Sequence, residues 1–581
     1  MDFLLISPPV ANFGQASSGL SVLTAYLRAQ GWDAHQWDLA IDAFHHFHAP
    51  EQLEACRQLL AANAGRVDPA ILEAAGRVVA EIDGAKAALR RPGIEADTET
   101  MRWAFQTIHD AGVVLTAASL GRYEHDFRHF GVADAFRSME TLDAALGDPD
   151  RNPYLAYFRE HALPRVVASA PRAIGLSLTY FSQVMPGFTL LRLLREALPE
   201  TPVILGGAYL TAVEHDVERI RADVVPADAV ILHDGEAGLD RWLELVLRGE
   251  GAPAAIENCY LPGPAGTFAR AGERNIAHTD IAALPSPLWI ADGLDLDKYL
   301  VPKYPVPLPL SRGCYWGRCN YCNISCQTAA TYRTRPVELA LEDMRHAMTE
   351  TGSNWFDFPV DSFRPKELRA LAEGVIEAGL EIEWGAEVLL DPGFLKDDTV
   401  ELLARSGCRT LRFGLESACV ETLQAMNKPT RPEKARELLG RCKAAGVQTA
   451  VMLIAGYPTE TQRQLYETYD YLVENRDRID FLTIHQYSLV PGSPMSADPA
   501  SHGLYVLPQE AVLWTSMPFQ NTNPVGMRNE DLPEVVDAMK AGLKEHYPDL
   551  GELWTVAIGG WMTFPAACGV RRDLVHPTSG G

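Results

Sequence analysis

The chain has 581 residues, of which 47% are hydrophobic and 22% charged, as in an ordinary globular enzyme. Its net charge of −25 disfavours binding to nucleic acid or to an anionic membrane surface. No apolar run approaches the roughly 20 residues that a membrane-spanning helix needs. The length suggests about three or four domains. Because the N-terminal sequence has no basic leader and the thiols are clustered, we expect a cytoplasmic protein.

The first domain, predicted for residues 1–250, opens as a βαβ unit. A buried strand at 2–7 is followed by a helical pattern and by a second strand at 34–39. From about 50 to 165 the pattern is helical, and we interpret this stretch as an insertion. Among the histidines in and near it, His125 and His129 have a ligand-like spacing, one helical turn apart. We expect solvent-facing or core histidines there rather than metal ligands.

Three further strands, predicted at 173–178, 202–207 and 229–232, each end in small or hydroxyl-bearing residues. Loops at the carboxyl ends of parallel strands form the ligand crevice of an open α/β sheet, and glycines allow the backbone to approach a large flat ligand. A nucleotide-binding or purely structural α/β domain would show similar turns. The candidate ligand-binding residues are Ser177, Thr179, Gly206, Gly207, Tyr209, Gly235 and Glu236.

Residues 251–300 are rich in Gly, Pro and Ala and predict a connector. Repeated helix–strand units then predict a partial (β/α) barrel over 301–500. Residues 501–581 contain no motif that we recognise and are taken as a small C-terminal domain. That domain is rich in aromatic residues, and an amphipathic helix is predicted at 534–545. The fold class is therefore α/β.

Four of the ten cysteines fall between Cys314 and Cys326, in a loop that follows a short predicted strand at 306–310. Glycines before and between them allow several thiolates to converge on one inorganic centre. A zinc knuckle usually has a second ligand pair, and no other Cys-x2-Cys is present. Two iron–sulfur triads are possible: Cys314, Cys319 and Cys322, or Cys319, Cys322 and Cys326.

This loop resembles the cluster loop of the radical S-adenosylmethionine (SAM) superfamily, in which three cysteines hold a [4Fe-4S] cluster and SAM binds the fourth iron. The usual spacing is Cys-x3-Cys-x2-Cys, whereas the first gap here holds four residues. A Ser-Arg-Gly before the loop and Tyr321 before the last cysteine match the family and favour Cys314, Cys319 and Cys322 as ligands. Further matches to the family imply SAM contacts at Asp361, Glu387, Glu416, Ser417 and Gly456. Glu387 fits a barrel-interior carboxylate equally well.

Upstream, the order strand–Gly-Leu-Ser, strand–Leu-Gly-Gly, strand–Asp-Gly-Glu resembles the cobalamin-binding domain of cobalamin-dependent radical SAM enzymes. The Asp-x-His-x-x-Gly signature, by which other cobalamin proteins supply a histidine to cobalt, is absent. The resemblance therefore implies cobalamin without a histidine ligand from that motif.

Together these resemblances imply a radical SAM C-methyltransferase that uses a [4Fe-4S] cluster, SAM and cobalamin. In that family a deoxyadenosyl radical abstracts a substrate hydrogen, methylcobalamin donates the methyl group, and a second SAM remethylates cobalt. The implied partners are a small-molecule or peptide natural-product substrate and an electron donor such as flavodoxin or ferredoxin. Cyclisation, rearrangement or epimerisation with the same cofactors, and a non-catalytic sensor, are the alternatives. The pattern identifies no catalytic side chain of the protein itself.

Overall fold

The computed structural model describes residues 1–94, 97–275, 279–290, 294–327 and 331–547. They form two compact units. The first contains Met1–Ile94, Glu99–Tyr304 and the short segment Glu510–Trp514. The second contains Pro305–Gln509 and the described residues from Thr515 to Tyr547. Among the described residues, no helix is long and apolar enough to cross a membrane.

The first unit is built on a seven-stranded sheet in the order β2-β1-β5-β6-β7-β8-β9. The strands β1 to β7 of this sheet pair in parallel, which confirms the predicted Rossmann-like sheet. The order turns back on itself between β1 and β5, the point at which open α/β sheets bind their ligands. The parallel strands are β1 (Phe3–Ser7), β2 (Ala34–Asp38), β5 (Ala173–Ser177), β6 (Val203–Gly206) and β7 (Ala229–Ile231).

The core of this unit lies where helices cover the sheet. Leu20 and Leu27 of α1 pack with Phe3 and Leu5 of β1, and Trp242 of α12 joins the same cluster. The helices are α1 (Ser18–Ala29), α2 (Leu39–Phe47), α9 (Val184–Ala197), α10 (Ala208–Ala212), α11 (Glu214–Val217) and α12 (Glu236–Leu243).

The stretch predicted as a connector instead contributes two strands to this sheet. β8 (Cys259–Pro262) pairs antiparallel with β7, and β9 (Phe268–Arg270) pairs antiparallel with β8. These strands are only four and three residues long and are joined through a turn that contains proline and glycine. A run this short, interrupted by turn residues, lacks the alternation by which a strand is recognised in a sequence.

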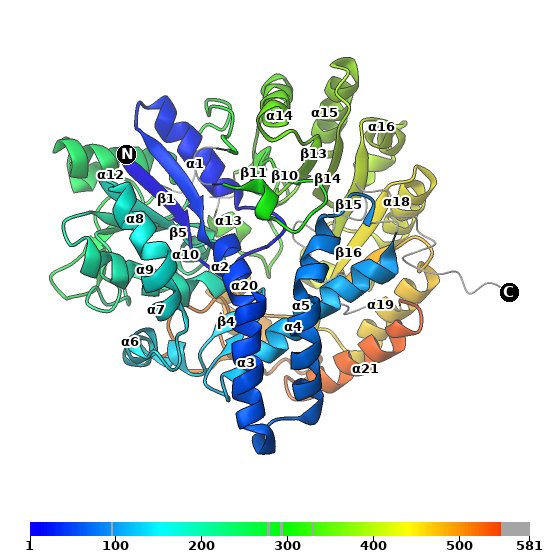
Figure 1. Cartoon of the computed structure of the whole chain (residues 1–581). Helices are drawn as coiled ribbons and strands as arrows, with labels where there is room; N and C mark the ends of the chain where they lie inside the picture. The colour runs from blue at the N-terminus through cyan, green and yellow to red at the C-terminus, as the bar shows by residue number, and fades with distance from the viewer. Residues whose placement is uncertain (95–96, 276–278, 291–293, 328–330, 548–581) are drawn as a thin grey trace. The chain divides into compact units, whose positions relative to one another are not determined.

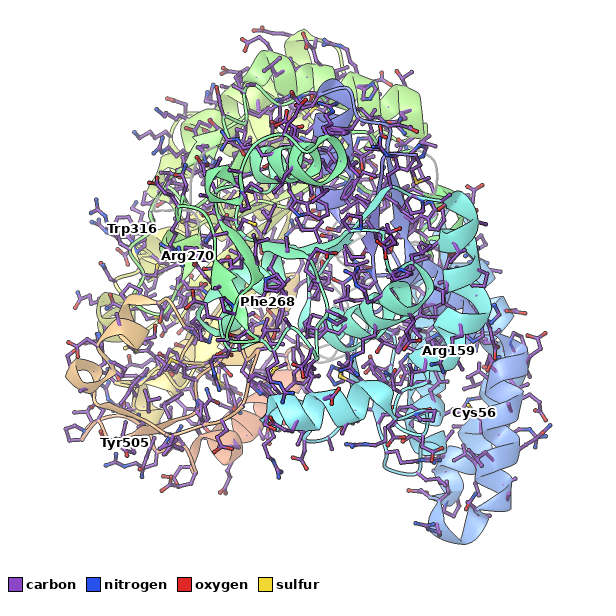
Figure 2. The ribbon with its side chains drawn as sticks, turned by 90° about the vertical axis from the view of Figure 1, so that its left-hand side faces the viewer. Cys56, Arg159, Phe268, Arg270, Trp316 and Tyr505 are labelled. Carbon is purple, nitrogen blue, oxygen red and sulfur yellow. The ribbon has the colours of Figure 1, made fainter. Side chains whose placement is uncertain are left out.

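The predicted insertion is mainly helical, and its α3 and α4 run side by side (Figure 1), with Cys56 on α3 (Figure 2). The prediction that His125 and His129 share a helix face is wrong. His125 lies on a strand of a short hairpin, where it is buried, and His129 follows in the turn. The elements are α3 (Pro50–Ala62), α4 (Pro69–Arg90), α5 (Thr98–Ala118), β3 (Glu124–His125), β4 (Phe130–Gly131), α6 (Met139–Gly147), α7 (Tyr154–Tyr157) and α8 (Leu163–Ser169).

The second unit is a six-stranded parallel sheet whose spatial order, β10-β13-β14-β15-β16-β17, follows the sequence. Helices alternate with the strands and line one side of the sheet (Figure 1). This confirms the predicted partial barrel. The strands are β10 (Val306–Pro307), β13 (Trp355–Phe358), β14 (Glu383–Leu389), β15 (Cys408–Glu416), β16 (Gln448–Ala455) and β17 (Phe481–Gln486). The helices are α14 (Val337–Thr351), α15 (Pro365–Glu377), α16 (Thr399–Arg405), α17 (Val420–Ala425), α18 (Pro432–Ala444) and α19 (Gln462–Glu474).

The described part of the C-terminal region ends in α21 (Leu532–Lys544), at the position of the predicted amphipathic helix. Trp554, Trp561 and Phe564, three of the aromatic residues noted in the sequence, lie outside the described residues. The remaining short elements are β11 (Ser311–Arg312), α13 (Ile324–Gln327), β12 (Arg333–Thr334), α20 (Pro494–Ala497), β18 (Leu504–Val506) and β19 (Phe519–Asn521).

Candidate active site

The cysteine loop lies just beyond the C-terminal end of β10, where a (β/α) barrel carries its chemistry. Its start is fixed by the backbone N–H of Gly313, which donates to Asp361 Oδ2 at 2.9 Å. The Tyr315 hydroxyl donates to Asp391 Oδ2 at 2.8 Å. Asp361, predicted to contact SAM, thus uses one carboxylate oxygen to hold the loop. Burial raises the pKa of Asp361, and the Gly313 hydrogen bond only partly offsets that effect.

The far side of the loop is joined to the end of α17 by four hydrogen bonds. Asn320 donates from its backbone to Met426 O at 3.0 Å and from its side chain to Ala425 O at 2.8 Å. Trp316 Nε1 donates to Asn427 O, and Asn427 Nδ2 donates back to Arg318 O, both at 2.8 Å. Two of these bonds hold the Cys-x4-Cys gap, and the two from Asn320 hold the gap that follows it.

Cys314, Cys319 and Cys322 are free thiols, each partly buried. Among the described residues, the one group of three candidate metal ligands within 4.8 Å of one another is elsewhere, at Cys419, Glu421 and Glu467. A set of three thiols fits a cluster with one open iron. The side chain of Cys326, which belongs to the rival triad, lies outside what the structure describes.

A buried lysine lies beside the cysteines. Lys428 Nζ is 2.9 Å from Glu416 Oε1 and 3.4 Å from the Tyr321 hydroxyl, and only 5% of the lysine side chain is exposed. Burial raises the pKa of the Cys319 thiol, and Lys428 and Tyr321 lower it to a smaller extent. Burial alone lowers the pKa of Lys428, but Glu416 and Cys319 outweigh that effect and the pKa stands above its ordinary value. The site therefore places a fixed positive charge next to the candidate cluster ligands.

The chain forms this ion pair by folding back at the end of β15. Glu416 has a φ of +64° and lies next to an irregularity in the pairing with β16. A Cβ on Gly414 would lie 2.5 Å from Glu416 Oε1 and 3.0 Å from Lys428 Nζ, so a larger residue there would displace the ends of these two side chains. Sequence reasoning selected Glu416 and missed Lys428, although it lies twelve residues downstream in the Met-Asn-Lys that follows.

Two other predicted SAM contacts have structural partners. The Ser417 hydroxyl is fully buried, lies 3.0 Å from Thr468 Oγ1 and accepts from the backbone of Cys419. Gly456 has a φ of +81°, and its N–H donates to Glu460 Oε2 at 2.7 Å. A Cβ on Gly456 would lie 2.3 Å from the Leu532 side chain. The glycine is therefore required by packing within the unit, whatever ligand lies nearby.

Glu387 belongs to a group of charges on three adjacent strands. Arg412 on β15 donates to Asp357 Oδ1 on β13 at 2.8 Å, and both side chains are almost fully buried. Glu387 lies on β14 between them, in register with Arg412. Burial raises the pKa of Glu387, and Arg412 lowers it to a smaller extent. This arrangement fits the interior-carboxylate interpretation of Glu387, with Arg412 as its compensating cation.

In the first unit, the predicted ligand-binding glycines differ in what surrounds them. Gly207 has a φ of +107°, and its Cβ would lie 2.3 Å from Leu178 O. The Cβ of Gly206 would lie 3.1 Å from Ile231 O, whereas that of Gly235 would meet nothing closer than Leu23 at 3.8 Å. The fold itself requires Gly207, but it leaves room at Gly235. Packing does not require a glycine at position 235, so the open space there is available for a bulky ligand to approach the backbone.

Hydroxyl residues of the first unit meet at the point where the strand order reverses. Ser177 ends β5, and Thr179 follows it with its Oγ1 3.3 Å from Ser17 Oγ in the loop after β1. The Thr179 backbone N–H donates to Gln183 Oε1 at 2.7 Å. Ser17, which we did not predict, therefore joins the crevice from a neighbouring strand. Its signal in the sequence is the Gly/Ser loop that precedes α1.

Tyr209 and Glu236 are both engaged with their own chain. The Tyr209 hydroxyl donates to Leu513 O, and the Leu513 N–H donates to Asp216 Oδ2 at 2.6 Å. Burial raises the pKa of Tyr209 far above its ordinary value. Glu236 is buried and accepts from Thr279 Oγ1 at 3.0 Å. The hydrogen bond of Tyr209 attaches the segment Glu510–Trp514 to the first unit.

Comparisons with known proteins identify the domain that the second unit contains. Residues 308–472 match the family model of the radical SAM superfamily, so the second unit contains a radical SAM domain. Such a domain binds a [4Fe-4S] cluster and SAM, which confirms these two predicted cofactors. The cysteine loop, Glu416 and Gly456 all fall inside the matched residues.

Relatives and solved structures extend the likeness to the rest of the chain. Bacteriochlorophyllide d C-12(1)-methyltransferase of Chlorobaculum tepidum is 29% identical over 32% of this chain and 41% of its own length. An uncharacterized methyltransferase of Pyrococcus horikoshii is 23% identical over 51% of this chain and 63% of its own. The aligned part thus spans less than two thirds of either relative.

The fold of nearly the whole chain matches that of TsrM, a radical SAM methyltransferase of Kitasatospora setae whose structure contains cobalamin and a [4Fe-4S] cluster. The TM-score is 0.60 at 13% identity, covering 99% of both chains. OxsB, a cobalamin-dependent radical SAM enzyme, matches with a TM-score of 0.54 at 15% identity, over 70% of this chain and 63% of its own. The predicted resemblance to cobalamin-dependent radical SAM enzymes is confirmed at the level of the fold.

Proposed function

We propose that this protein is a cobalamin-dependent radical SAM C-methyltransferase, which transfers a methyl group from SAM through cobalamin to a carbon of a small-molecule or peptide natural product. The observation that supports this most directly is the pairing of two sites in one chain. One is a cysteine loop with a buried Lys428–Glu416 ion pair. The other is a crevice at the reversal point of a Rossmann-like sheet. When bound, the cluster and SAM supply a carbon-centred radical, and cobalamin supplies the methyl group.

The residues of the chain have defined tasks in this proposal. Cys314, Cys319 and Cys322 hold the cluster, and the Tyr321 hydroxyl lies 3.4 Å from the nitrogen of Lys428. Lys428 offers a cation to the SAM carboxylate, while Glu416 and Asp361 offer carboxylates to its ammonium and hydroxyl groups. Arg412 keeps the interior carboxylates Asp357 and Glu387 compensated in a site from which water is excluded.

The corrinoid contacts in this proposal come from backbone and small side chains. Ser177, Thr179 and Ser17 provide hydroxyls at one edge, and the open face over Gly235 admits the flat macrocycle. Tyr209 and Glu236 support this edge indirectly, because their polar atoms bond to the chain itself. TsrM and OxsB, two structures with a similar fold, contain a corrinoid.

The proposal is tested by tracing the methyl group of SAM with an isotope. The reconstituted protein is given substrate, a reductant and SAM with a deuterated methyl group. We expect one 5′-deoxyadenosine and one S-adenosylhomocysteine for each methylated product, with the deuterium in the product. Deoxyadenosine without transfer of label would replace the proposal with the second candidate, cyclisation or rearrangement. The same cofactor site would serve that reaction. Methylated product without deoxyadenosine would indicate polar methyl transfer instead of a radical step.

The remaining alternative is a non-catalytic corrinoid or iron–sulfur sensor. It would bind the cofactors without cleaving SAM. The Lys428–Glu416 pair beside the cluster loop supports an enzyme, because a sensor has no need of a preformed site for a charged, reactive ligand. Reductive cleavage of SAM by the purified protein would exclude a sensor. We further propose a cytoplasmic location and a flavodoxin or ferredoxin as the source of electrons.

A further inference from the structure

A buried thiol and two carboxylates meet where the start of α17 lies against α19. The sulfur of Cys419 lies 3.1 Å from Glu421 Oε2. Glu467 of α19 brings a third donor atom, and the three donor atoms lie within 4.8 Å of one another. Cys419 is 2% exposed, Glu467 is partly exposed and Glu421 is exposed. We call these three residues the thiol–carboxylate group. None of them has a task in the proposed function.

Buried hydroxyl groups tie together the two segments that carry these donors. Thr468, next to Glu467 on α19, has its Oγ1 3.0 Å from Ser417 Oγ and accepts from the backbone N–H of Ala418 at 3.0 Å. The backbone N–H of Cys419 donates to Ser417 Oγ at 3.1 Å. Ser417 and Thr468 are almost completely buried. The fold itself therefore holds the backbone of Cys419 against α19.

A further buried polar group lies beside the cysteine. Cys419 is the N-cap of α17, and Thr422 is the third helical residue, which faces the N-cap side chain. Thr422 is 1% exposed, and its Oγ1 has no hydrogen-bond partner among the described residues. Burial raises the pKa of the Cys419 thiol, and Thr422 lowers it to a smaller extent. A hydroxyl left without an acceptor beside a sulfur is suited to donate to a thiolate, the form in which cysteine binds a metal.

From this geometry, we propose that the thiol–carboxylate group binds a zinc ion through the sulfur of Cys419 and one oxygen each of Glu421 and Glu467. Zinc accepts sulfur and carboxylate ligands together, and its four donor atoms stand roughly 3 to 4 Å apart. Because Glu421 is exposed, water can reach the fourth position. Binding replaces the S–H bond of the cysteine with an S–Zn bond, and the proton leaves to solvent.

The set of donors decides between zinc and the harder divalent ions. Calcium and magnesium take six or more oxygen ligands, whereas a thiolate is a soft ligand that suits zinc. The group carries three negative charges when Cys419 is a thiolate. Arg463 pairs with Glu467, but the arginine side chain is 72% exposed, and an exposed pair of this kind contributes little. A divalent ion therefore compensates charge that the arginine does not.

A zinc ion at this position would stabilise the helix that supports the cysteine loop. It joins the start of α17 to α19. At the other end of α17, the carbonyls of Ala425 and Met426 accept from the side chain and backbone of Asn320 in the loop. The role is structural and needs neither SAM nor cobalamin, so the inference does not rest on the proposed function.

The test measures zinc in protein whose iron–sulfur cluster has been reconstituted, so that the cysteine loop is already occupied. Zinc chloride is titrated in, and bound zinc and iron are measured by mass spectrometry after desalting. We expect one zinc ion per chain in the wild type. Cys419→Ser should bind zinc about a hundredfold more weakly and Glu467→Gln about tenfold, with unchanged iron. Zinc should raise the melting temperature of the wild type and not that of Cys419→Ser.

Two matched controls are available. Cys56 on α3 (Figure 2) is also a partly buried thiol, and it belongs to no group of candidate ligands among the described residues. Glu474 lies on α19 like Glu467 and forms an exposed pair with Arg436. Cys56→Ser and Glu474→Gln should bind zinc as the wild type does. Serine is a favourable N-cap, so Cys419→Ser should keep the melting temperature of the zinc-free wild type.

Two results would overturn the zinc site. One is a wild type that binds no zinc at a saturating concentration, and the other is a Cys419→Ser variant that binds zinc as tightly as the wild type. Iron content and SAM cleavage, measured in the same samples, test the proposed function separately. If the wild type assembles no iron–sulfur cluster, the titration is repeated with Cys314, Cys319 and Cys322 replaced by alanine, which removes the loop as a competing zinc site. Zinc should still bind there, and Cys419→Ser in that protein should abolish it.

Discussion

The two units of this protein carry their candidate sites in different ways. In the second unit the site consists of reactive side chains: three thiols, Tyr321, and the ion pair of Lys428 with Glu416. In the first unit the crevice consists of glycines, small hydroxyls and backbone, and its larger polar side chains bond to their own chain. A site that binds a metal cluster needs specific donor atoms, whereas a site for a flat macrocycle needs space. The two units should therefore respond to substitution in different ways.

The largest effect is expected at the thiols. Replacing Cys314, Cys319 and Cys322 together with alanine should abolish the brown chromophore and all SAM cleavage, because the cluster loses all three of its proposed thiolate ligands. Cys326→Ala is the control and should retain both. Iron content and absorbance measure the outcome. A cluster that survives in a Cys314 variant and is lost in the Cys326 variant would establish the rival triad.

In the first unit the glycines provide the corresponding test. Gly207→Ala places a Cβ 2.3 Å from a backbone oxygen at a φ of +107°, so we expect a destabilisation of about 2 kcal/mol or more. Gly235→Ala meets nothing within 3.8 Å and should leave the melting temperature within a degree or two. If the corrin lies over Gly235, its alanine variant should still bind cobalamin about tenfold more weakly. Calorimetry and equilibrium dialysis separate the two effects.

Equal binding of cobalamin by Gly235→Ala and the wild type would place the macrocycle elsewhere. Loss of stability in that variant would show instead that packing requires the glycine. Gly206→Ala, with a Cβ 3.1 Å from Ile231 O, should fall between the other two in stability.

The difference between the units also explains what the sequence could predict. The cysteine loop, the parallel strands and Glu416 could be located because each has a residue type or period that few other structures share. Lys428 was missed because its significance depends on the fold-back at Gly414, which only the three-dimensional path of the chain reveals. Strands β8 and β9 were missed because runs of four and three residues carry no period.

The crevice of the first unit shows a further limit of sequence reasoning. Tyr209 lies next to the glycine pair in sequence and was predicted to face the ligand, yet its hydroxyl bonds to Leu513, 304 residues away. A contact between residues so distant in sequence leaves no local pattern. His125 gives the same lesson, since its spacing from His129 fits a helix turn but the two belong to a hairpin.

An intermediate effect is expected at Lys428. Lys428→Met should leave the cluster assembled but weaken SAM binding about tenfold or more, because it removes a cation and leaves Glu416 unpaired in a buried site. Lys434→Met is a matched control, since Lys434 forms only an exposed pair with Glu437. Titration of SAM into the reconstituted protein without reductant measures the difference. Unchanged SAM affinity in the Lys428 variant would remove this residue from the SAM site.

The last expected effect is a dependence of stability on pH, and it concerns one buried carboxyl group in each unit. Burial raises the pKa of Asp38 in the first unit to about 6 and that of Glu460 in the second to about 7. A carboxyl group whose pKa is higher in the fold holds its proton more tightly there. The free energy of unfolding should therefore fall as the pH rises from about 4 to 6 for Asp38 and from about 4.5 to 7 for Glu460, by about 3 kcal/mol each as an upper bound.

The two carboxyl groups differ in their partners, and the isosteric amides should expose that difference. Asp38 accepts from Ala40 N at 2.9 Å and from the Tyr299 hydroxyl at 2.7 Å, so both of its oxygens are used. Glu460 accepts from Gly456 N through one oxygen, while the other is buried without a partner among the described residues.

Glu460→Gln removes a charge that nothing compensates, so at pH 8 its melting temperature should exceed that of the wild type by a few degrees. At pH 5, where the wild-type carboxyl is protonated, the two should match. Asp38→Asn should show no such gain at pH 8, because the amide has one acceptor oxygen and its NH2 group cannot accept from the second donor. A gain at pH 8 in both variants would show that charge burial alone governs these sites and that the partners of each oxygen do not matter. A gain in neither would show that the buried charge of Glu460 does not destabilise the fold.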